Sequence, residues 1–273
     1  MAEIKRKGAR SIKDIPEDVL NQLNHGEIES ANLVEYLGVD RMKLLENLLG
    51  QCCRGKYVQP ILNQIDKLEK RTPKTVYEII ATGIFEQIKV HNDSELLYII
   101  STHQSDIVRC WATYIIGKNT ELGIGQMLQE IRPFATDRHF NVRECAWADV
   151  RKSIIRNLSE SIAILSTWAM DSDENIRRFA SEATRPRGVW CEHIEVLKQN
   201  PKLGLSILEP LKSDKSKYVQ NSVGNWLNDA SKTQPEFVRE LCKRWEKESD
   251  TIETKYIIKR ALRTIDKSLS KLS

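Results

Sequence analysis

The chain has 273 residues, of which 40% are hydrophobic and 29% are charged, and it carries a formal net charge of +4. This composition supplies enough apolar surface for a buried core and excludes a chain that is disordered by composition. The mildly basic balance permits a nucleic-acid partner without requiring one. Glycine and proline are sparse, at 12 and 8 residues, which favours helices over loop-rich or all-β folds.

The sequence lacks the motifs that are typical of several classes of protein. The six cysteines form no C-x-x-C pair, and no histidines cluster at zinc spacing. The sequence contains no P-loop, no H-E-x-x-H and no G-x-S-x-G motif. No apolar run approaches a membrane span, and no apolar stretch follows the basic N-terminus as in a signal peptide. We therefore expect no metal, cofactor, nucleotide or membrane partner, and a reduced, cytoplasmic protein.

The N-terminal third has helical periodicity. Residues 1–15 are basic and predict a mobile arm, and residues 16–273 contain no linker and predict a single domain. Two short helices are expected between residues 16 and 40, separated near His25 and Gly26. Further helices are expected in MKLLENLLGQCC and PKTVYEIIATGIFEQIKV, with Pro16 and Pro73 in first-turn positions.

A short motif then recurs through the chain. It consists of a polar turn, an aliphatic residue, a basic or amide residue, and a small apolar residue four positions after the aliphatic one. Its copies are SDIVRCWA, HFNVRECA, DENIRRFA, SKYVQNSV and, less regularly, KYIIKRAL around Ile258. Amphipathic stretches such as GIGQMLQEIRPFA lie between the copies, which gives two helices per repeat.

Recurring helix pairs predict a stacked array, because one pair cannot bury its apolar face alone. The predicted fold class is all-α: a right-handed α-solenoid of HEAT-like helical repeats with a concave basic face. The small residue of each motif lets the neighbouring helix approach closely. A solenoid with polar ends is expected to be a monomer.

The chain has six tryptophans, which is many for a helical protein of this size. Trp111, Trp168 and Trp245 extend apolar helix faces and are expected in the core. Trp147 and Trp190 lie among arginines, where an aromatic ring could flank a base while guanidinium groups hold phosphates. Core packing is the alternative for these two as well.

The arginines divide into two groups. Arg109, Arg143 and Arg177 recur in register and predict structural pairs with acids of neighbouring repeats. The non-repeating arginines are candidates for DNA contacts: Arg151, Arg156, Arg178, Arg185 and Arg187. Pro186 ends a helix, and we expect it to leave Arg185 and Arg187 on a corner that points outward.

A polar stripe follows in SDKSKYVQNSVGNWLNDASK. Asn221, Asn225 and Asn228 share one helical face, and lysines flank them. Such a stripe suits contact with phosphate and sugar oxygens. An ordinary solvated face is the alternative.

Two strings carry a family resemblance. Ser-Glu-x-x-Arg-Pro-Arg at 181–187 and Val-x-Asn-x-Leu-Asn-Asp at 223–229 resemble the AlkC/AlkD family of bacterial DNA alkylation repair proteins, the AlkC branch in particular. The resemblance is strongest from about Val142 to Val238. It implies a solenoid that holds duplex DNA and a glycosylase that excises N3- or N7-alkylated purines.

The resemblance also implies site residues. Asp149, Trp147 and Trp190 are the expected catalytic residues, with tryptophan faces against the cationic nucleotide and the carboxylate near the sugar. The AlkC branch carries a glutamate where Trp147 stands in WADVR, so this chain departs from the pattern. The expected DNA-binding residues are Arg151, Lys152, Arg156, Arg178, Arg185, Arg187, Lys217, Asn221, Asn225 and Lys232.

Three functions remain open at this point. The first is an alkylated-base DNA glycosylase, a hydrolase acting on alkylated duplex DNA. The second is a non-catalytic protein that binds damaged or bent DNA. The third is a scaffold for a protein partner.

Overall fold

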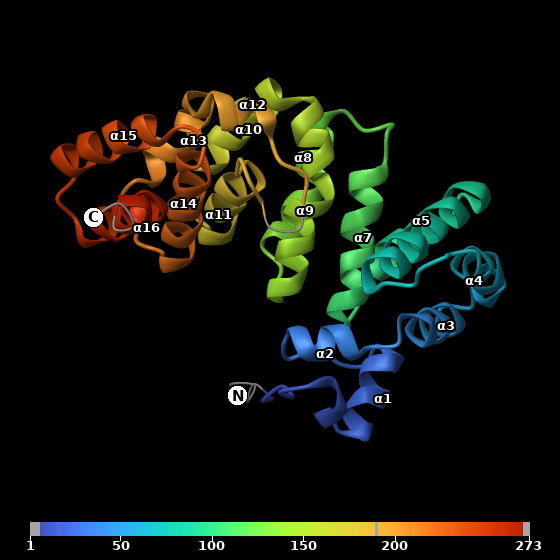
Figure 1. Ribbon diagram of the computed structural model, residues 1–273. Coiled ribbons are helices and arrows are strands. Elements are labelled where there is room, and N and C mark those ends of the chain that lie inside the picture. The colour runs from blue at the N-terminus through green and yellow to red at the C-terminus, as the bar shows by residue number, and fades with distance from the viewer. Residues whose placement is uncertain (1–5, 189–190, 270–273) are drawn as a thin grey trace. The chain divides into compact units, whose positions relative to one another are not determined.

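The computed structural model describes residues 6–188 and 191–269, and within these residues it contains α-helices and 3-10 helices and no β-strand (Figure 1). The α-helices are α1 Glu17–His25, α2 Leu33–Gly38, α3 Arg41–Gln51, α4 Val58–Asp66, α5 Pro73–His91, α6 Ser94–Thr102, α7 Asp106–Lys118, α8 Ile124–Ala135, α9 Phe140–Arg156, α10 Leu158–Trp168, α11 Glu174–Ala183, α12 Glu195–Gln199, α13 Leu205–Leu208, α14 Lys217–Ser231, α15 Pro235–Glu248 and α16 Ile252–Leu269. The 3-10 helices are η1 Ile12–Asp14, η2 Gly55–Tyr57, η3 Pro201–Gly204 and η4 Glu209–Leu211. The all-α class predicted from the sequence is confirmed.

The chain divides into two compact units. Unit 1 comprises Met1–Asn119 and Asp137–Ala146, and unit 2 comprises Thr120–Thr136 and Trp147–Ser273. Helix α9 contributes its first turns to unit 1 and its remaining turns to unit 2. The single domain over residues 16–273 stays a prediction.

Local signals explain where helices begin and end. Thr72 and Thr75 form a capping box at the start of α5, with Pro73 as its first residue. Gly26 ends α1 in the left-handed conformation at φ +72°, which glycine adopts without a Cβ penalty. The predicted break near His25 and Gly26 is therefore confirmed.

The five copies of the motif lie in α7, α9, α11, α14 and α16. The aliphatic and small residues of the first four copies are buried. In the fifth copy the buried pair is Ile257 and Ala261, while Ile258 is half-buried. The register predicted around Ile258 is wrong by one residue, because Ile257 and Ala261 are the pair on the inner face of α16.

Unit 2 has two layers of helices. Helices α11, α14 and α16 pack side by side in one layer, and α10, α13 and α15 lie in the other (Figure 1). Gly224 permits the close approach of α16 to α14, because a Cβ at Gly224 would lie 2.7 Å from the Cβ of Arg260. Layered helix pairs of this kind bury a continuous apolar core.

An arginine at the fourth position of α7, α9 and α11 ties each helix to the turn before it. Arg109 donates from Nη1 to the carbonyl oxygens six and five residues earlier, at 2.7 and 2.8 Å. Arg143 and Arg177 donate to carbonyl oxygens at the same two offsets. In α14, Gln220 takes this place and donates to the carbonyl oxygen of Asp214 at 2.8 Å.

Two of these arginines also bind a carboxylate that follows them in the chain. Arg109 binds Asp137 with Nε to Oδ2 at 2.7 Å, and Arg177 binds Asp214 with Nε to Oδ2 at 2.6 Å. Asp137 and Asp214 each also accept the backbone N–H two residues later. The structural role predicted for Arg109 and Arg177 is confirmed.

The segment before α1 is bound to the segment around α2. Arg6 donates to both carboxylate oxygens of Glu35 at 2.6 Å, and the backbone N–H of Ala9 donates to the same carboxylate at 3.2 Å. Asn32 donates to the carbonyl oxygen of Ala9 at 2.8 Å. From Arg6 onward the segment therefore differs from the mobile arm expected for residues 1–15, because a buried carboxylate and an amide hold it.

Among the described residues, no helix combines the length and apolarity that a membrane crossing requires.

Replacement of Arg177 by alanine tests the guanidinium tie. Arg177→Ala leaves the buried carboxylate of Asp214 without its ion pair and frees two carbonyl oxygens, so we expect unfolding to become easier by about 3 kcal/mol. Arg239→Ala removes an exposed ion pair with Glu236 and should lower the free energy of unfolding by only about 0–1 kcal/mol. Urea unfolding measures both, and equal losses in the two variants would contradict the interpretation.

Candidate nucleic-acid interface

Arg151 in α9 clamps the corner that follows α11. Its side chain is buried at 1% exposure, and Nε donates to the carbonyl oxygen of Glu192 at 2.8 Å. Nη1 and Nη2 donate to the carbonyl oxygens of Ala183 and Arg185 at 2.8 and 2.5 Å. The expected contact of Arg151 with phosphate is not compatible with this geometry, since the corner uses all three nitrogens of the guanidinium.

Arg185 lies in a buried network between α11 and α14. Its guanidinium donates to Asp229 at 2.7 and 2.9 Å and to Glu182 at 2.6 Å. Glu182 also accepts from Ser222 at 2.6 Å, and Ser222 accepts from Ser181 at 2.8 Å. The expectation that Arg185 points outward is wrong, because two carboxylates more than compensate its charge inside the protein.

Glu182 remains ionised in this network. Burial alone would raise the pKa of Glu182, but the positive charges of Arg178 and Arg185 and the hydrogen bond from Ser222 hold it below its usual value. Arg178 also donates to the carbonyl oxygen of Tyr218 at 2.9 Å, and its guanidinium lies 3.9 Å from the centroid of the Tyr218 ring. The Ser-Glu-x-x-Arg-Pro-Arg string therefore joins two neighbouring helices.

The rest of the corner is less buried. Arg187 is half-buried, and its Nε is enclosed without a hydrogen-bond partner in the described part of the chain. The carbonyl oxygen of Pro186 accepts the N–H of Ile194 at 3.0 Å, which closes the loop. Trp190, expected to contact a lesion, lies outside the described residues. Its role stays a prediction.

The other two expected catalytic residues lie in α9. Trp147 is buried at 8% exposure, so most of its ring packs inside the protein. Asp149, two residues later, is half-buried. The face of α9 that carries Trp147 and Arg151 is thus an inner face.

Four of the predicted cations are accessible to a partner: Lys152, Arg156, Lys217 and Lys232. Lys232 lies 3.1 Å from Asp229 and is partly compensated. Lys217 places its ammonium 2.7 Å from the centroid of the Tyr256 ring. These side chains come from α9, from the start of α14 and from just after its end.

The asparagine stripe of α14 faces α16. Asn221 accepts from the hydroxyl of Tyr256 at 2.8 Å, and Asn228 donates to Thr264 at 2.9 Å. Asn225 accepts from Arg260 at 3.0 Å and from Arg263 at 2.9 Å. The expectation of direct phosphate contacts by this stripe conflicts with these bonds, because the amides serve the packing of two helices.

Arg260 and Arg263 are cationic residues that the sequence reasoning missed. They lie three residues apart on α16, and Arg260 contacts Tyr256, the residue whose ring lies against Lys217 of α14. The signal was present in the fifth copy of the motif, KYIIKRALRT, where an inner pair at Ile257 and Ala261 turns Arg260 and Arg263 toward the neighbouring helix. The register error concealed it.

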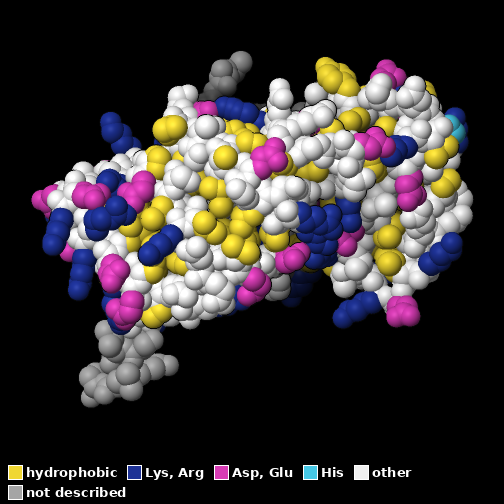
Figure 2. Space-filling model, turned by 90° about the horizontal axis from the view of Figure 1, so that it is seen from above, with side chains coloured by type: hydrophobic (Ala, Val, Ile, Leu, Met, Phe, Trp, Pro, Cys, Tyr) yellow, Lys and Arg dark blue, Asp and Glu magenta, His cyan; other side chains and the backbone are white. Residues whose placement is uncertain are grey.

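The opposite layer of unit 2 has a different charge pattern. Figure 2 shows Lys and Arg side chains interspersed with Asp and Glu at the end of unit 2 that carries α15. Pairs such as Arg239 with Glu236 compensate one another there. A surface of mixed sign does not attract a polyanion, so we do not expect α15 to take part in an interface with nucleic acid.

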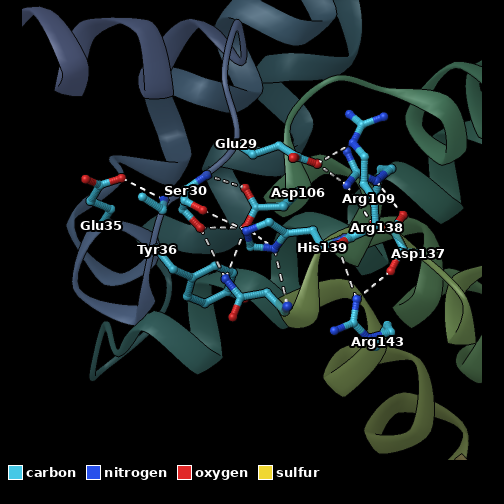
Figure 3. Close-up of polar contacts among 12 residues, drawn as sticks. Glu29, Ser30, Glu35, Tyr36, Asp106, Arg109, Asp137, Arg138, His139 and Arg143 are labelled. Atoms are coloured by element: carbon cyan, nitrogen blue, oxygen red, sulfur yellow. Dashed lines mark hydrogen bonds and ion pairs between the residues drawn. The ribbon is translucent and has the colours of Figure 1, made fainter. Parts of the chain in front are cut away.

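Unit 1 contains a buried polar cluster that resembles a catalytic triad in composition (Figure 3). The hydroxyl of Ser30 donates to Asp106 at 2.7 Å, and His139 lies 3.3 Å from the same carboxylate. His139 Nε2 bonds the carbonyl oxygen of Ser30 at 2.7 Å instead of its hydroxyl. The histidine therefore has no position from which to activate Ser30.

This cluster holds the segment before α2 in place. Asn141 donates to Asp106 at 3.1 Å, and Glu29 accepts from Arg138 at 2.9 Å (Figure 3). All these partners belong to unit 1. No group of histidine, cysteine and acidic side chains in the described ranges is arranged to hold a metal ion.

Glu182→Gln tests the buried network through pH. Because the pKa of Glu182 is lowered in the folded protein, its carboxylate stabilises the fold at neutral pH, and this contribution is lost as pH falls below about 4. At pH 7 we expect the variant to lose about 3 kcal/mol of unfolding free energy. Urea unfolding at pH 7, pH 4 and pH 3 should show the gap in unfolding free energy between variant and wild type narrowing below pH 4. A gap of constant size would contradict an ionised Glu182.

Comparisons with known proteins relate this chain to DNA alkylation repair proteins. The sequence profile of the DNA alkylation repair enzyme family matches residues 139–265. The chain is 36% identical over 145 residues to the uncharacterised protein YhaZ of Bacillus subtilis, a match that covers 53% of this chain and 39% of that protein. The chain thus spans about two-fifths of the length of this relative.

Two solved structures have similar folds. The alkylpurine DNA glycosylase AlkC of Pseudomonas fluorescens, bound to DNA containing an abasic site analog, matches with a TM-score of 0.66 and 20% identity, over 94% of this chain and 65% of that chain. AlkD2 of Streptococcus mutans matches with a TM-score of 0.58 and 24% identity, over 76% of this chain and 97% of that chain.

All the candidate DNA-binding residues lie within the matched residues 139–265, on α9, α11 and α14 or in the segments that follow α11 and α14. The helical-repeat fold predicted from the sequence is confirmed by the two structures. The right-handed twist and the concave basic face stay predictions. The resemblance predicted from the two sequence strings is also confirmed, since over residues 139–265 this chain matches the DNA alkylation repair enzyme family.

Proposed function

We propose that this chain binds duplex DNA and excises N3- or N7-alkylated purines by hydrolysis of the N-glycosidic bond. The supporting observation is that Lys152 and Arg156 of α9, Lys217 of α14 and Lys232 just after α14 are exposed, inside the residues that match the DNA alkylation repair enzyme family. Accessible lysines and arginines bind the phosphate backbone without regard to sequence.

The proposed substrate is already reactive, so the protein has to lower only part of the barrier to hydrolysis. An alkylated purine is cationic and is already a good leaving group, so the main barrier is the positive charge that develops on the sugar. A carboxylate near the sugar would stabilise that charge or position water. Asp149 is the candidate, because it is half-buried on α9 among accessible cations.

The neighbouring carboxylates are poorer candidates. Glu182 and Asp229 are buried, and arginine guanidinium groups bind both of them. Burial keeps both carboxylates away from a nucleotide at the surface. Trp147 would contribute by cation–π attraction between the face of its ring and the cationic base.

A non-catalytic DNA-binding protein is the second candidate function. Its supporting observation is that Trp147 occupies the position of the AlkC-branch glutamate and is buried at 8% exposure. Such a protein would recognise damaged or bent duplex through shape and phosphate contacts.

Release of free base separates the two candidates. The protein is incubated with duplex DNA that carries 7-methylguanine and 3-methyladenine, and free base is measured by chromatography. We expect release by the wild type, and a loss of roughly 100-fold or more in Asp149→Asn. Trp147→Ala should also lower the rate.

Glu240→Gln, which changes an exposed carboxylate of α15, is the matched control and should release base at the wild-type rate. Unchanged release by Asp149→Asn would exclude Asp149 as the catalytic carboxylate. No release by the wild type, together with salt-sensitive DNA binding, would favour the non-catalytic function.

The salt dependence of DNA affinity tests the interface itself. Lys152→Ala and Arg156→Ala should each lower the slope of log K against log salt by about 1, because each removes one phosphate contact. Lys243→Ala and Lys247→Ala change exposed cations of α15 and should leave the slope unchanged. Equal effects of the two pairs would mean that DNA binds without preference for this face.

A further inference from the structure

Two arginines of α16 share one neutral acceptor on α14. Arg260 Nη2 lies 3.0 Å from Asn225 Oδ1, and Arg263 Nη1 lies 2.9 Å from the same oxygen. Arg260 Nη1 also donates to the hydroxyl oxygen of Tyr256 at 3.2 Å. Two like charges thus converge on an uncharged amide, an arrangement that the fold alone does not favour.

Neither arginine forms an ion pair in the described part of the chain. The two guanidinium groups offer about ten N–H donors, five each, and make the three hydrogen bonds just described. The Nε of Arg260 is enclosed without a hydrogen-bond partner. Half-buried arginines ordinarily pair with a carboxylate, so the cluster has unused capacity to bind an anion.

The nearest acidic group does not neutralise the pair. Asp229 binds Arg185 at 2.7 Å and Lys232 at 3.1 Å, so cations of the corner already compensate it. In agreement with this geometry, burial and the adjacent charge of Arg260 lower the pKa of Arg263.

Other arginines of unit 2 show what is unusual here. Arg177 binds Asp214, and Arg132 binds Asp171. Arg151 lacks a carboxylate, but three carbonyl oxygens use its Nε, Nη1 and Nη2. In Arg260 and Arg263 the donors exceed the acceptors, and neither guanidinium binds a carboxylate of the described residues.

A third cation extends the cluster along the surface. The ammonium of Lys217 lies 2.7 Å from the centroid of the Tyr256 ring, whose hydroxyl donates to Asn221. Tyr256 thus joins Lys217 to Arg260 within one hydrogen-bonded surface of α14 and α16. Lys217 is exposed and the two arginines are half-buried, so an anion in solvent can approach this surface.

We propose that Arg260 and Arg263, held by Asn225 and flanked by Lys217, form a phosphate-binding site that takes a phosphodiester of the DNA backbone. The assignment of DNA as the source of the phosphate rests on the proposed function. A phosphate presents several oxygens to forked N–H donors and supplies the negative charge that the cluster lacks. The asparagine of α14 orients the arginines without neutralising them.

Asn225→Asp is the sharpest variant, because it keeps the shape of the side chain and adds the missing carboxylate. The new carboxylate would pair with both arginines, so we expect a higher melting temperature in chloride and no further rise with inorganic phosphate. The wild type should melt a few degrees higher in phosphate than in chloride at equal ionic strength.

Two further variants keep this test falsifiable. Arg263→Gln should lose the phosphate response without losing stability in chloride. Arg244→Gln, on α15 and bound to Glu209, should respond to phosphate as the wild type does. A wild-type melting temperature that is the same in phosphate and chloride, or a response retained in Asn225→Asp and Arg263→Gln, would overturn the site.

DNA binding separates this proposal from the proposed function. With duplex DNA, Arg263→Gln should lower the slope of log K against log salt by about 1. An unchanged slope in a protein that binds DNA and releases base would overturn the phosphodiester assignment and leave the proposed function intact. A wild type that responds to phosphate but does not bind DNA would support an anion site for free phosphate and overturn the proposed function.

Discussion

The guanidinium tie at the start of the repeated helices is the interaction on which the rest of the structure depends. A helix that follows a tight turn leaves carbonyl oxygens of that turn unpaired, and burying them without partners is costly. Arg109, Arg143 and Arg177 each supply two N–H bonds to these oxygens at the same offsets. Where the arginine also reaches an aspartate of the following turn, as Arg177 reaches Asp214, the same side chain fixes the spacing between repeats. The spacing in turn decides which residues of each helix face inward, and so which of the other arginines are free to contact a partner.

Periodicity alone was sufficient to predict the helical repeats, because a buried aliphatic residue and a small residue four positions later leave a pattern in any sequence. The same pattern could not separate structural from accessible arginines. Arg185 and Arg263 are both arginines near the end of a repeat, yet Arg185 binds Asp229, 44 residues later, and Arg263 binds only an amide. Such pairings depend on contacts between distant segments, which one sequence does not reveal. The one-residue error around Ile258 had the same origin, since both Ile257 and Ile258 are aliphatic and only packing selects between them.

The sequence predicted only part of the candidate site, again because pairing between distant segments decides which residues are accessible. The motif Ser-Glu-x-x-Arg-Pro-Arg indicated the family, but its acid and its first arginine compensate each other inside the protein. A string that identifies a family need not contact its ligand, because a residue that holds two helices in register is under as strict a geometric requirement as one that binds substrate. The asparagine stripe was predicted on the correct face of α14 and with the wrong partner. Its amides contact α16, and the cations that they orient had been overlooked.

The buried ion pairs and the accessible cations should respond differently to salt. This difference connects the fold to the proposed function. Buried pairs such as Arg185 with Asp229 are shielded from mobile ions, so the stability that they provide should change little with ionic strength. Contacts between Lys152, Arg156 or Arg263 and a phosphate backbone release counterions and weaken steeply as salt increases. Arginines such as Arg185 thus stabilise the fold, whereas Arg156 and Arg263, which bind no carboxylate among the described residues, are arginines that we propose to contact DNA. An amide at position 225, in place of an acid, leaves the charge of Arg260 and Arg263 available to an external anion.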